Sequence, residues 1–114
     1  MRLRSDIWVA AYLRRCGSEG VFAALRRRGS PEAGAIFIKI DRLDGTSTLY
    51  GPAPQSEAQE DGRDRLFLRA HKEEWLDTAE VEARLAKQIA YDSDLWIVEA
   101  EDRAGRHFLD LAEA

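Results

Sequence analysis

The chain has 114 residues, of which 45% are hydrophobic and 33% are charged. This balance is typical of one globular domain and excludes an intrinsically disordered chain. No apolar run approaches the roughly 18 residues that a membrane-spanning helix needs, so we expect no membrane association. The N-terminus lacks the pattern of a signal peptide, and the single cysteine, Cys16, cannot form an internal disulfide. We therefore expect a cytoplasmic protein.

The net charge of −4 is unevenly distributed. Residues 1–28 hold seven arginines and two acids, a local charge of +5, whereas residues 29–114 hold ten bases and nineteen acids, a charge of −9. The molecule as a whole is therefore not a general polyanion binder, although one end of it is basic.

Two segments precede the most regular part of the sequence. Helical spacing of apolar residues predicts a helix over residues 6–16, with Ser5 as its N-cap and a stop at the glycines of 17–20. Residues 21–28 fit either a short strand or a short helix, and we favour the strand, because breaks on both sides leave only a few residues.

Residues 33–51 predict a β-hairpin around which the domain is organised. Ile36, Ile38 and Ile40 recur with the period of a strand, and Asp44-Gly45 is typical of a two-residue turn. Such a turn would pair Ile40 with Leu49 and place the isoleucines and Leu49 on one core-facing side. The second face of the sheet would then be partly open and would carry Phe37, Lys39 and Tyr50.

The second half of the chain alternates strand and helix signals. Residues 51–64 contain no aromatic or branched aliphatic side chain and predict a mobile acidic loop. Strands are predicted at 66–70 and 94–101, and a helix from an Asp77 cap to about residue 91. A turn at 103–105 would return residues 107–109 as a short partner strand. The expected fold is one α+β domain over 1–114, with a mostly antiparallel sheet of five to six strands and two helices packed on one face.

Carboxylates near the last strand form a candidate metal site. Glu99 and Glu101 would point the same way from one strand and, together with Asp41, offer oxygen ligands to a hard cation. With Lys39 nearby, the set would suit a divalent-metal phosphodiesterase. However, no acid lies two residues before Lys39, as a metal nuclease motif requires, and such acids also occur as solvated charges that protect a sheet edge.

A candidate binding surface is carried by arginines and one tryptophan. Arginines near the ends of the first two segments would bind phosphate groups if they met on one edge, although cations at a helix end also simply complement its dipole. Trp75 follows a polar stretch and would serve either as an exposed anchor for a partner or as a core residue. The candidate binding residues are Arg14, Arg15, Arg26, Arg27, Arg28 and Trp75.

Catalytic motifs give no support for an enzyme. The chain has no nucleophile motif, no P-loop and no glycine-rich dinucleotide fingerprint. His71 and His107, the two histidines, lack the further ligands of a zinc site, and we expect no cofactor.

Three stretches, SDIWVAAYLRRC, GAIFIKIDRLDGT and DSDLWIVEAEDRAGRHFLD, together resemble a family of short alphaproteobacterial proteins catalogued as a domain of unknown function. The resemblance covers nearly the whole chain except 51–64. It implies a stand-alone cytoplasmic domain, and it assigns no activity, cofactor or catalytic residue.

Three functional hypotheses follow. The first is a non-enzymatic protein-interaction or self-associating module, with a protein partner or a homodimer. The second is binding of RNA or single-stranded nucleic acid through the arginines of residues 14–28. The third is the divalent-metal phosphodiesterase.

Overall fold

The computed structural model describes residues 3–54 and 65–112. Most of the loop predicted at 51–64 lies outside these described residues. The elements in chain order are α1 (Ser5–Ser18), β1 (Phe22–Arg27), β2 (Ile36–Asp41), β3 (Thr46–Pro52), β4 (Phe67–Arg69), β5 (Leu76–Asp77), α3 (Thr78–Tyr91) and β6 (Trp96–Glu101). The predicted helices, the strand at 21–28 and the strands at 36–41, 66–70 and 94–101 are thus confirmed, with small shifts of their ends.

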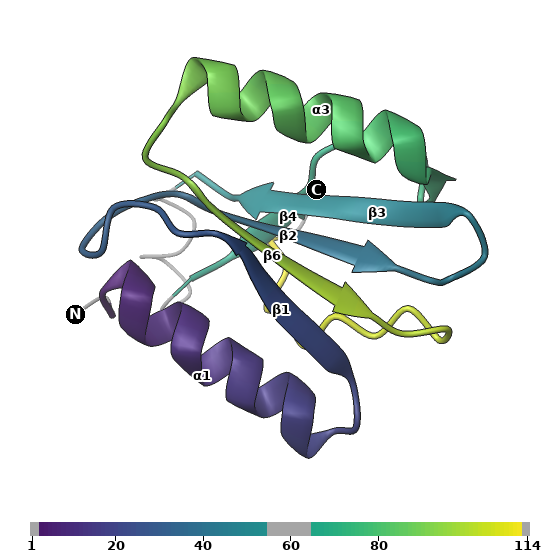
Figure 1. The fold of residues 1–114 in the computed structure, drawn as a ribbon, viewed down its shortest axis with the longest axis horizontal. Coiled ribbons are helices and arrows are strands. Elements are labelled where there is room, and N and C mark those ends of the chain that lie inside the picture. Colours follow the sequence, from purple (N-terminus) through teal and green to yellow (C-terminus); the bar gives the residue numbers. More distant parts are fainter. Residues whose placement is uncertain (1–2, 55–64, 113–114) are drawn as a thin grey trace.

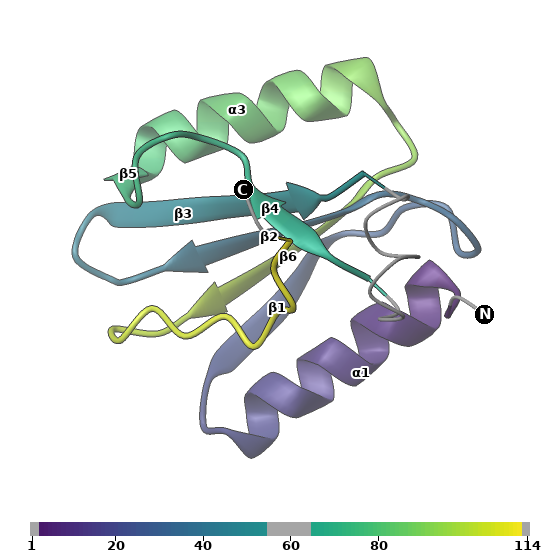
Figure 2. The same cartoon turned by 180° about the vertical axis from the view of Figure 1, so that it is seen from behind.

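The strands form one six-stranded sheet in the order β1-β6-β2-β3-β4, and β5 also pairs with β3 (Figures 1 and 2). β2 and β6 are parallel neighbours, and every other pair is antiparallel. The predicted α+β class with a mostly antiparallel sheet is therefore confirmed. None of the helices in the described part of the chain is long and apolar enough to cross a membrane.

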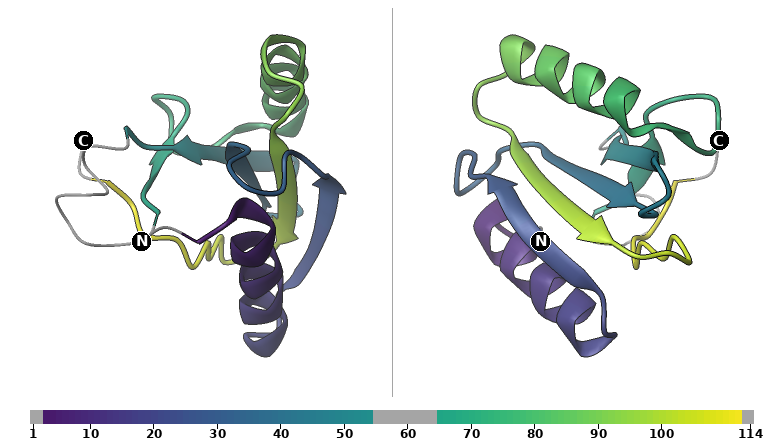
Figure 3. Two further views of the ribbon diagram at one scale, coloured as in Figure 1. Left: turned by 90° about the vertical axis from the view of Figure 1, so that its left-hand side faces the viewer. Right: turned by 45° about the vertical axis from the view of Figure 1, so that its right-hand side comes forward.

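The two helices do not share one face of the sheet, as the sequence led us to expect. The left view of Figure 3 shows α3 above the sheet and α1 below it. Side chains of β2 alternate between them: Ile38 packs in a cluster with Val9 of α1, whereas Phe37 packs in a cluster with Val81 of α3. Because both faces of β2 are apolar, each face requires its own cover.

The hairpin register also differs from the prediction. Lys39 pairs with Leu49 and Ile40 with Thr48, one residue away from the expected pairing. The cause is a three-residue loop at 43–45, closed by a hydrogen bond of 3.1 Å from the amide of Arg42 to the carbonyl of Thr46. Leu43 and Gly45 adopt positive φ within this loop. As a result, Leu49 packs on the α3 face and Tyr50 on the α1 face.

The predicted final hairpin is absent. β6 lies between β1 and β2, so both of its edges are already paired and residues 107–109 have no strand edge to join. The chain after β6 instead crosses the α1 face, where Phe108 and Leu109 pack against the core. Residues 110–112 lie beside β4: the amide of Phe67 donates to the carbonyl of Asp110, and the amide of Ala112 donates to the carbonyl of Phe67, both at 2.9 Å.

The predicted helix caps are only partly present. Ser5 is the first residue of α1 rather than its cap, and its buried hydroxyl donates instead to the carbonyl of Gly34 at 2.7 Å. Asp77 does precede α3, but its side chain makes no capping hydrogen bond. The start of α3 is held by the hydroxyl of Thr78, which lies 2.8 Å from that of Ser47 on β3.

Candidate functional site

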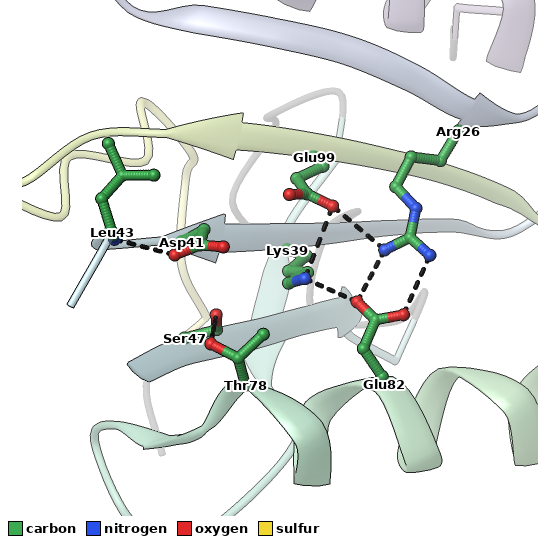
Figure 4. Close-up of polar contacts among 8 residues, drawn as sticks. All are labelled: Arg26, Lys39, Asp41, Leu43, Ser47, Thr78, Glu82 and Glu99. Carbon is green, nitrogen blue, oxygen red and sulfur yellow. Dashed lines mark hydrogen bonds and ion pairs between the residues drawn. The ribbon is translucent and has the colours of Figure 1, made fainter. Parts of the chain in front are cut away.

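The most connected polar cluster lies where α3 overhangs the sheet. It consists of Arg26, Lys39, Glu82 and Glu99, and Figure 4 shows how they converge from β1, β2, α3 and β6. The Lys39 ammonium lies 2.5 Å from Glu82 and 3.5 Å from Glu99. Arg26 donates to both carboxylate oxygens of Glu82, at 2.7 and 2.9 Å, and to Glu99 at 3.0 Å.

Burial differs strongly within this cluster. The Lys39 side chain is only 4% exposed, whereas that of Glu82 is 37% exposed. A buried ammonium is strongly unfavourable without anionic partners, so the two glutamates allow Lys39 to lie between sheet and helix. The pKa of Glu82 falls to about 2, chiefly because Arg26 donates hydrogen bonds to it and also because Lys39 does. The charges therefore satisfy one another, which is typical of a structural ion-pair network.

The predicted metal ligands share one face of the sheet but do not form a metal site there. Asp41 and Glu101 are direct neighbours across the parallel β2–β6 pair. Glu99 lies on the same face, but it is paired with Arg26 and Lys39. Asp41 accepts a hydrogen bond of 2.8 Å from the amide of Leu43. Within residues 3–54 and 65–112, no three His, Cys, Asp or Glu side chains are grouped to hold a metal ion.

The structure does not bring the predicted arginines together. α1 and β1 run in opposite directions from the turn at 19–21, so Arg14 and Arg15 lie near that turn while Arg26 to Arg28 lie at the far end of β1. Each group therefore presents only part of the phosphate-binding edge that the sequence suggested.

Most of these arginines also have intramolecular partners. Arg15 lies over the ring of Phe108 and pairs with Glu19. Arg27 donates to the carbonyl of Ser93 at 2.7 Å, and Arg28 lies over the ring of Trp96.

Trp75 is half-buried rather than projecting as a free anchor. The Arg42 guanidinium lies 3.9 Å from its ring centroid. On another side, Gly105 is so close that a Cβ there would lie 2.7 Å from ring atoms of Trp75. The tryptophan therefore fastens the loop after β6 to the hairpin loop.

The histidines and the cysteine take structural positions. His71 is buried, accepts a hydrogen bond of 3.0 Å from the amide of Leu49, and its other ring nitrogen lies 2.7 Å from the carbonyl of Glu73. Burial lowers the pKa of both His71 and His107. Cys16, a residue of α1, is fully buried, and burial raises the pKa of its thiol.

Sequence reasoning missed the open edge of the sheet. β1 is one of the two outer strands, and among the described residues it pairs with β6 alone. Phe22, at its start, is 66% exposed, and Leu25 is 37% exposed. An apolar Phe-Ala-Ala-Leu run without charge or proline is a visible signal, but only the order of the strands shows that it lies at an edge.

These features define a small α+β domain with an open strand edge and, within its described part, no group of His, Cys, Asp or Glu side chains placed to hold a metal ion. The model of the DUF1491 family, described as a protein of unknown function, matches residues 3–110, and the chain belongs to this family. A comparison with curated proteins gave no match.

Solved structures support the same assignment. The chain is similar to a DUF1491 family protein from Caulobacter crescentus CB15 known from a crystal structure, with 35% identity, complete coverage of both chains and a TM-score of 0.81. It is also similar to protein Atu0922 from A. tumefaciens, known from a solution structure, with 38% identity, coverage of 100% of this chain and 98% of that one, and a TM-score of 0.82.

Proposed function

We propose that this domain is a self-associating interaction module in which the open edge of β1 pairs antiparallel with β1 of a second copy. The observation that carries this proposal is the contrast between the two ends of the sheet. At the far end, the chain's own residues 110–112 hydrogen-bond to β4. At the near end, among the described residues, no segment lies along the outer edge of β1.

The first half of β1 lacks the usual protection of an edge strand. Natural edge strands carry charges, prolines or bulges that discourage pairing with other chains. In β1 a bulge between Leu25 and Arg27, together with the arginines, protects only the second half. The exposed Phe22 precedes two alanines, Ala23 and Ala24, which leave the backbone accessible. This half supplies main-chain donors and acceptors beside an apolar anchor, which is what strand addition uses.

One register makes two copies of β1 complementary. If Ala24 lies on the twofold axis, Phe22 of each copy faces Arg26 of the other, and Ala23 faces Leu25. The two residues of each facing pair lie on the same face of the combined sheet. Phe22 and Ala24, which pair with Glu101 and Glu99, lie on the face toward α3, and Ala23 lies on the face toward α1. Arg26 is fixed by Glu82 and Glu99, so it reaches the facing ring of Phe22 at a small cost in side-chain entropy.

The charge pattern favours the same register. Each Arg26 is already neutralised by carboxylates of its own chain, which limits repulsion between the two copies. The small Ala24 side chains at the axis allow close approach of the backbones. A contact limited to one strand is smaller than the standard interface of about 1,600 Å², so we expect a reversible dimer with micromolar affinity.

Sedimentation equilibrium and light scattering test the proposal. The dimeric fraction of the wild-type protein should increase as the protein concentration is raised. Phe22→Lys, which replaces the apolar anchor of the edge with an ammonium, should weaken dimerisation at least about tenfold. Because Phe22 is largely exposed, the variant should keep its fold. Tyr91→Lys is the matched control, since Tyr91 is an aromatic residue 93% exposed at the end of α3. A monomer at all concentrations, or a dimer indifferent to Phe22→Lys, would overturn the proposal.

A cross-link tests the register. Residues facing each other in an antiparallel pair have Cα atoms roughly 4.5–5.5 Å apart, within the range of a disulfide. Ala24→Cys should therefore form a disulfide-linked dimer on mild oxidation. Gly17→Cys, at an exposed position of α1 whose Cβ would meet nothing within 4 Å, should not form such a disulfide. Equal cross-linking of the two variants would contradict the register.

A further inference from the structure

A groove lies on the opposite flank of α3 from the ion-pair cluster. It encloses about 330 Å³, near the lower end of the range for small-molecule sites. Its apolar lining comes from three places: β3, the residue that directly follows β4, and α3. Polar side chains of α3 form the rest of the lining. The lining residues are Leu49, Ala70, Glu80, Ala83, Arg84, Lys87 and Gln88.

Arg84 has only long polar contacts in this groove. Its Nη1 lies 3.5 Å from the carbonyl of Ala70, and its Nη2 lies 3.9 Å from Glu80. Its Nε is buried and has no hydrogen-bond partner in the described part of the chain. Arg26, by comparison, makes three hydrogen bonds of 2.7–3.0 Å to carboxylates. A guanidinium with such long contacts retains the capacity to donate to another anion.

The charge of the groove points to the same ligand chemistry. Lys87 follows Arg84 by three residues and lines the same flank of the helix. Glu80 is the one acid of the lining, and it stands at a long distance from Arg84. The lining therefore carries two cations and one anion beside an apolar floor of Leu49, Ala70 and Ala83. A small molecule with a carboxylate and a compact apolar body matches this arrangement.

The floor of the groove is held in place by hydrogen bonds. The amide of Ala70 donates to the carbonyl of Leu49 at 2.8 Å, and the amide of Leu49 donates to His71 at 3.0 Å. Protonation of that His71 nitrogen would place two N–H groups against each other, which agrees with the lowered pKa that burial gives this imidazole. A fixed floor lowers the cost of ordering a site when a ligand binds.

From these observations we infer that the groove beside α3 binds small organic carboxylates, with Arg84 and Lys87 receiving the carboxylate. This inference does not depend on self-association, because the groove and the β1 edge share no residue.

Amide chemical shifts measured during titration with sodium benzoate test the inference, with neutral benzamide as the matched probe. Benzoate should shift the signals of Ala70, Ala83 and Arg84 in a saturable way, with a dissociation constant of about 1–10 mM. Benzamide should bind at least about tenfold more weakly, because it lacks the charge that Arg84 and Lys87 recognise. Arg84→Gln should weaken benzoate binding about tenfold, and Arg14→Gln on α1 should leave it unchanged.

One variant separates binding from loss of structure. Glu80→Gln removes the acid that competes for Arg84, so it should strengthen benzoate binding about two- to threefold. No saturable shift with benzoate, equal binding of benzamide, or weaker binding by Glu80→Gln would each overturn the inference.

Discussion

The ammonium of Lys39 and a carboxylate oxygen of Glu82 lie 2.5 Å apart and join β2, inside the sheet, to α3. The pair is unequal, because Lys39 is 4% exposed and Glu82 is 37% exposed. Lys39 therefore depends on its partners more than Glu82 does. This inequality gives the two residues different expected costs on substitution.

Glu82→Ala should destabilise the domain more than Lys39→Met. Removal of Glu82 leaves a buried ammonium with Glu99 alone, at 3.5 Å, and should cost about 1–3 kcal/mol of the free energy of unfolding. Lys39→Met keeps the apolar stem, and Glu82 keeps Arg26, so its cost should stay below about 1 kcal/mol. Urea denaturation measures the free energy of unfolding of both variants. Glu80→Ala is the control on the same helix and should cost less than about 0.5 kcal/mol. The opposite order of Glu82→Ala and Lys39→Met would show that the cluster is not held as described.

The titration of Glu82 should report the same cluster. Its pKa of about 2 lies well below the usual 4.5, and hydrogen bonds from Arg26 are the largest cause. Carbon NMR of the side-chain carboxyl should therefore show Glu82 ionised well below the range of exposed glutamates. Arg26→Ala should raise the pKa of Glu82 more than Lys39→Met does. A larger effect of Lys39→Met would assign the main role to the lysine instead.

The elements of this fold could be predicted from local pattern, but their arrangement could not. Alternation and helical spacing identify α1, α3 and β2, because period and turn signals are local properties. The predicted hairpin register is wrong because it presumes a two-residue turn and one core-facing side. Both faces of β2 are buried, so a slip by one residue moves Leu49 from one core to another and not into water.

The candidate sites depended even more on long-range contacts. Nothing in the order of the residues shows that β6 inserts between β1 and β2. This insertion removes the strand edge that residues 107–109 were expected to join, and it leaves β1 as an edge strand of the sheet. Glu82 is one of several acids on its helix, and only the packing of α3 on the sheet brings it to Lys39. The carboxylates near the last strand were predicted to share a face, and Asp41 and Glu101 do so.

Stability should fall as the solution is acidified below about pH 6.5, because of His71 and His107. Burial lowers the pKa of both imidazoles in the folded state, so just below pH 6.5 the unfolded chain binds more protons than the folded chain. Their contribution is therefore complete above the unfolded pKa and is lost as the pH falls toward the folded pKa. Urea denaturation of the wild type and of His71→Gln across this range measures the effect. The variant can still accept the hydrogen bond from the amide of Leu49, and its stability should decline less steeply with falling pH. An identical decline in the two proteins would show that His71 does not contribute to the pH dependence of stability.

Alanine substitution at two glycines should change the stability of the domain in opposite directions. Gly105 has a φ of +75°, and a Cβ there would lie 2.7 Å from ring atoms of Trp75. Gly105→Ala should therefore cost about 1–3 kcal/mol and alter tryptophan fluorescence, because the ring must move or the loop must shift. Gly17 lies within α1 with open space around its Cβ position, so Gly17→Ala should stabilise the domain by up to about 1 kcal/mol. Thermal and urea denaturation compare the two variants directly. If Gly105→Ala is neutral while Gly17→Ala stabilises, the segment after β6 is not fastened by Trp75, and the covering of the α1 face depends on Phe108 and Leu109 instead.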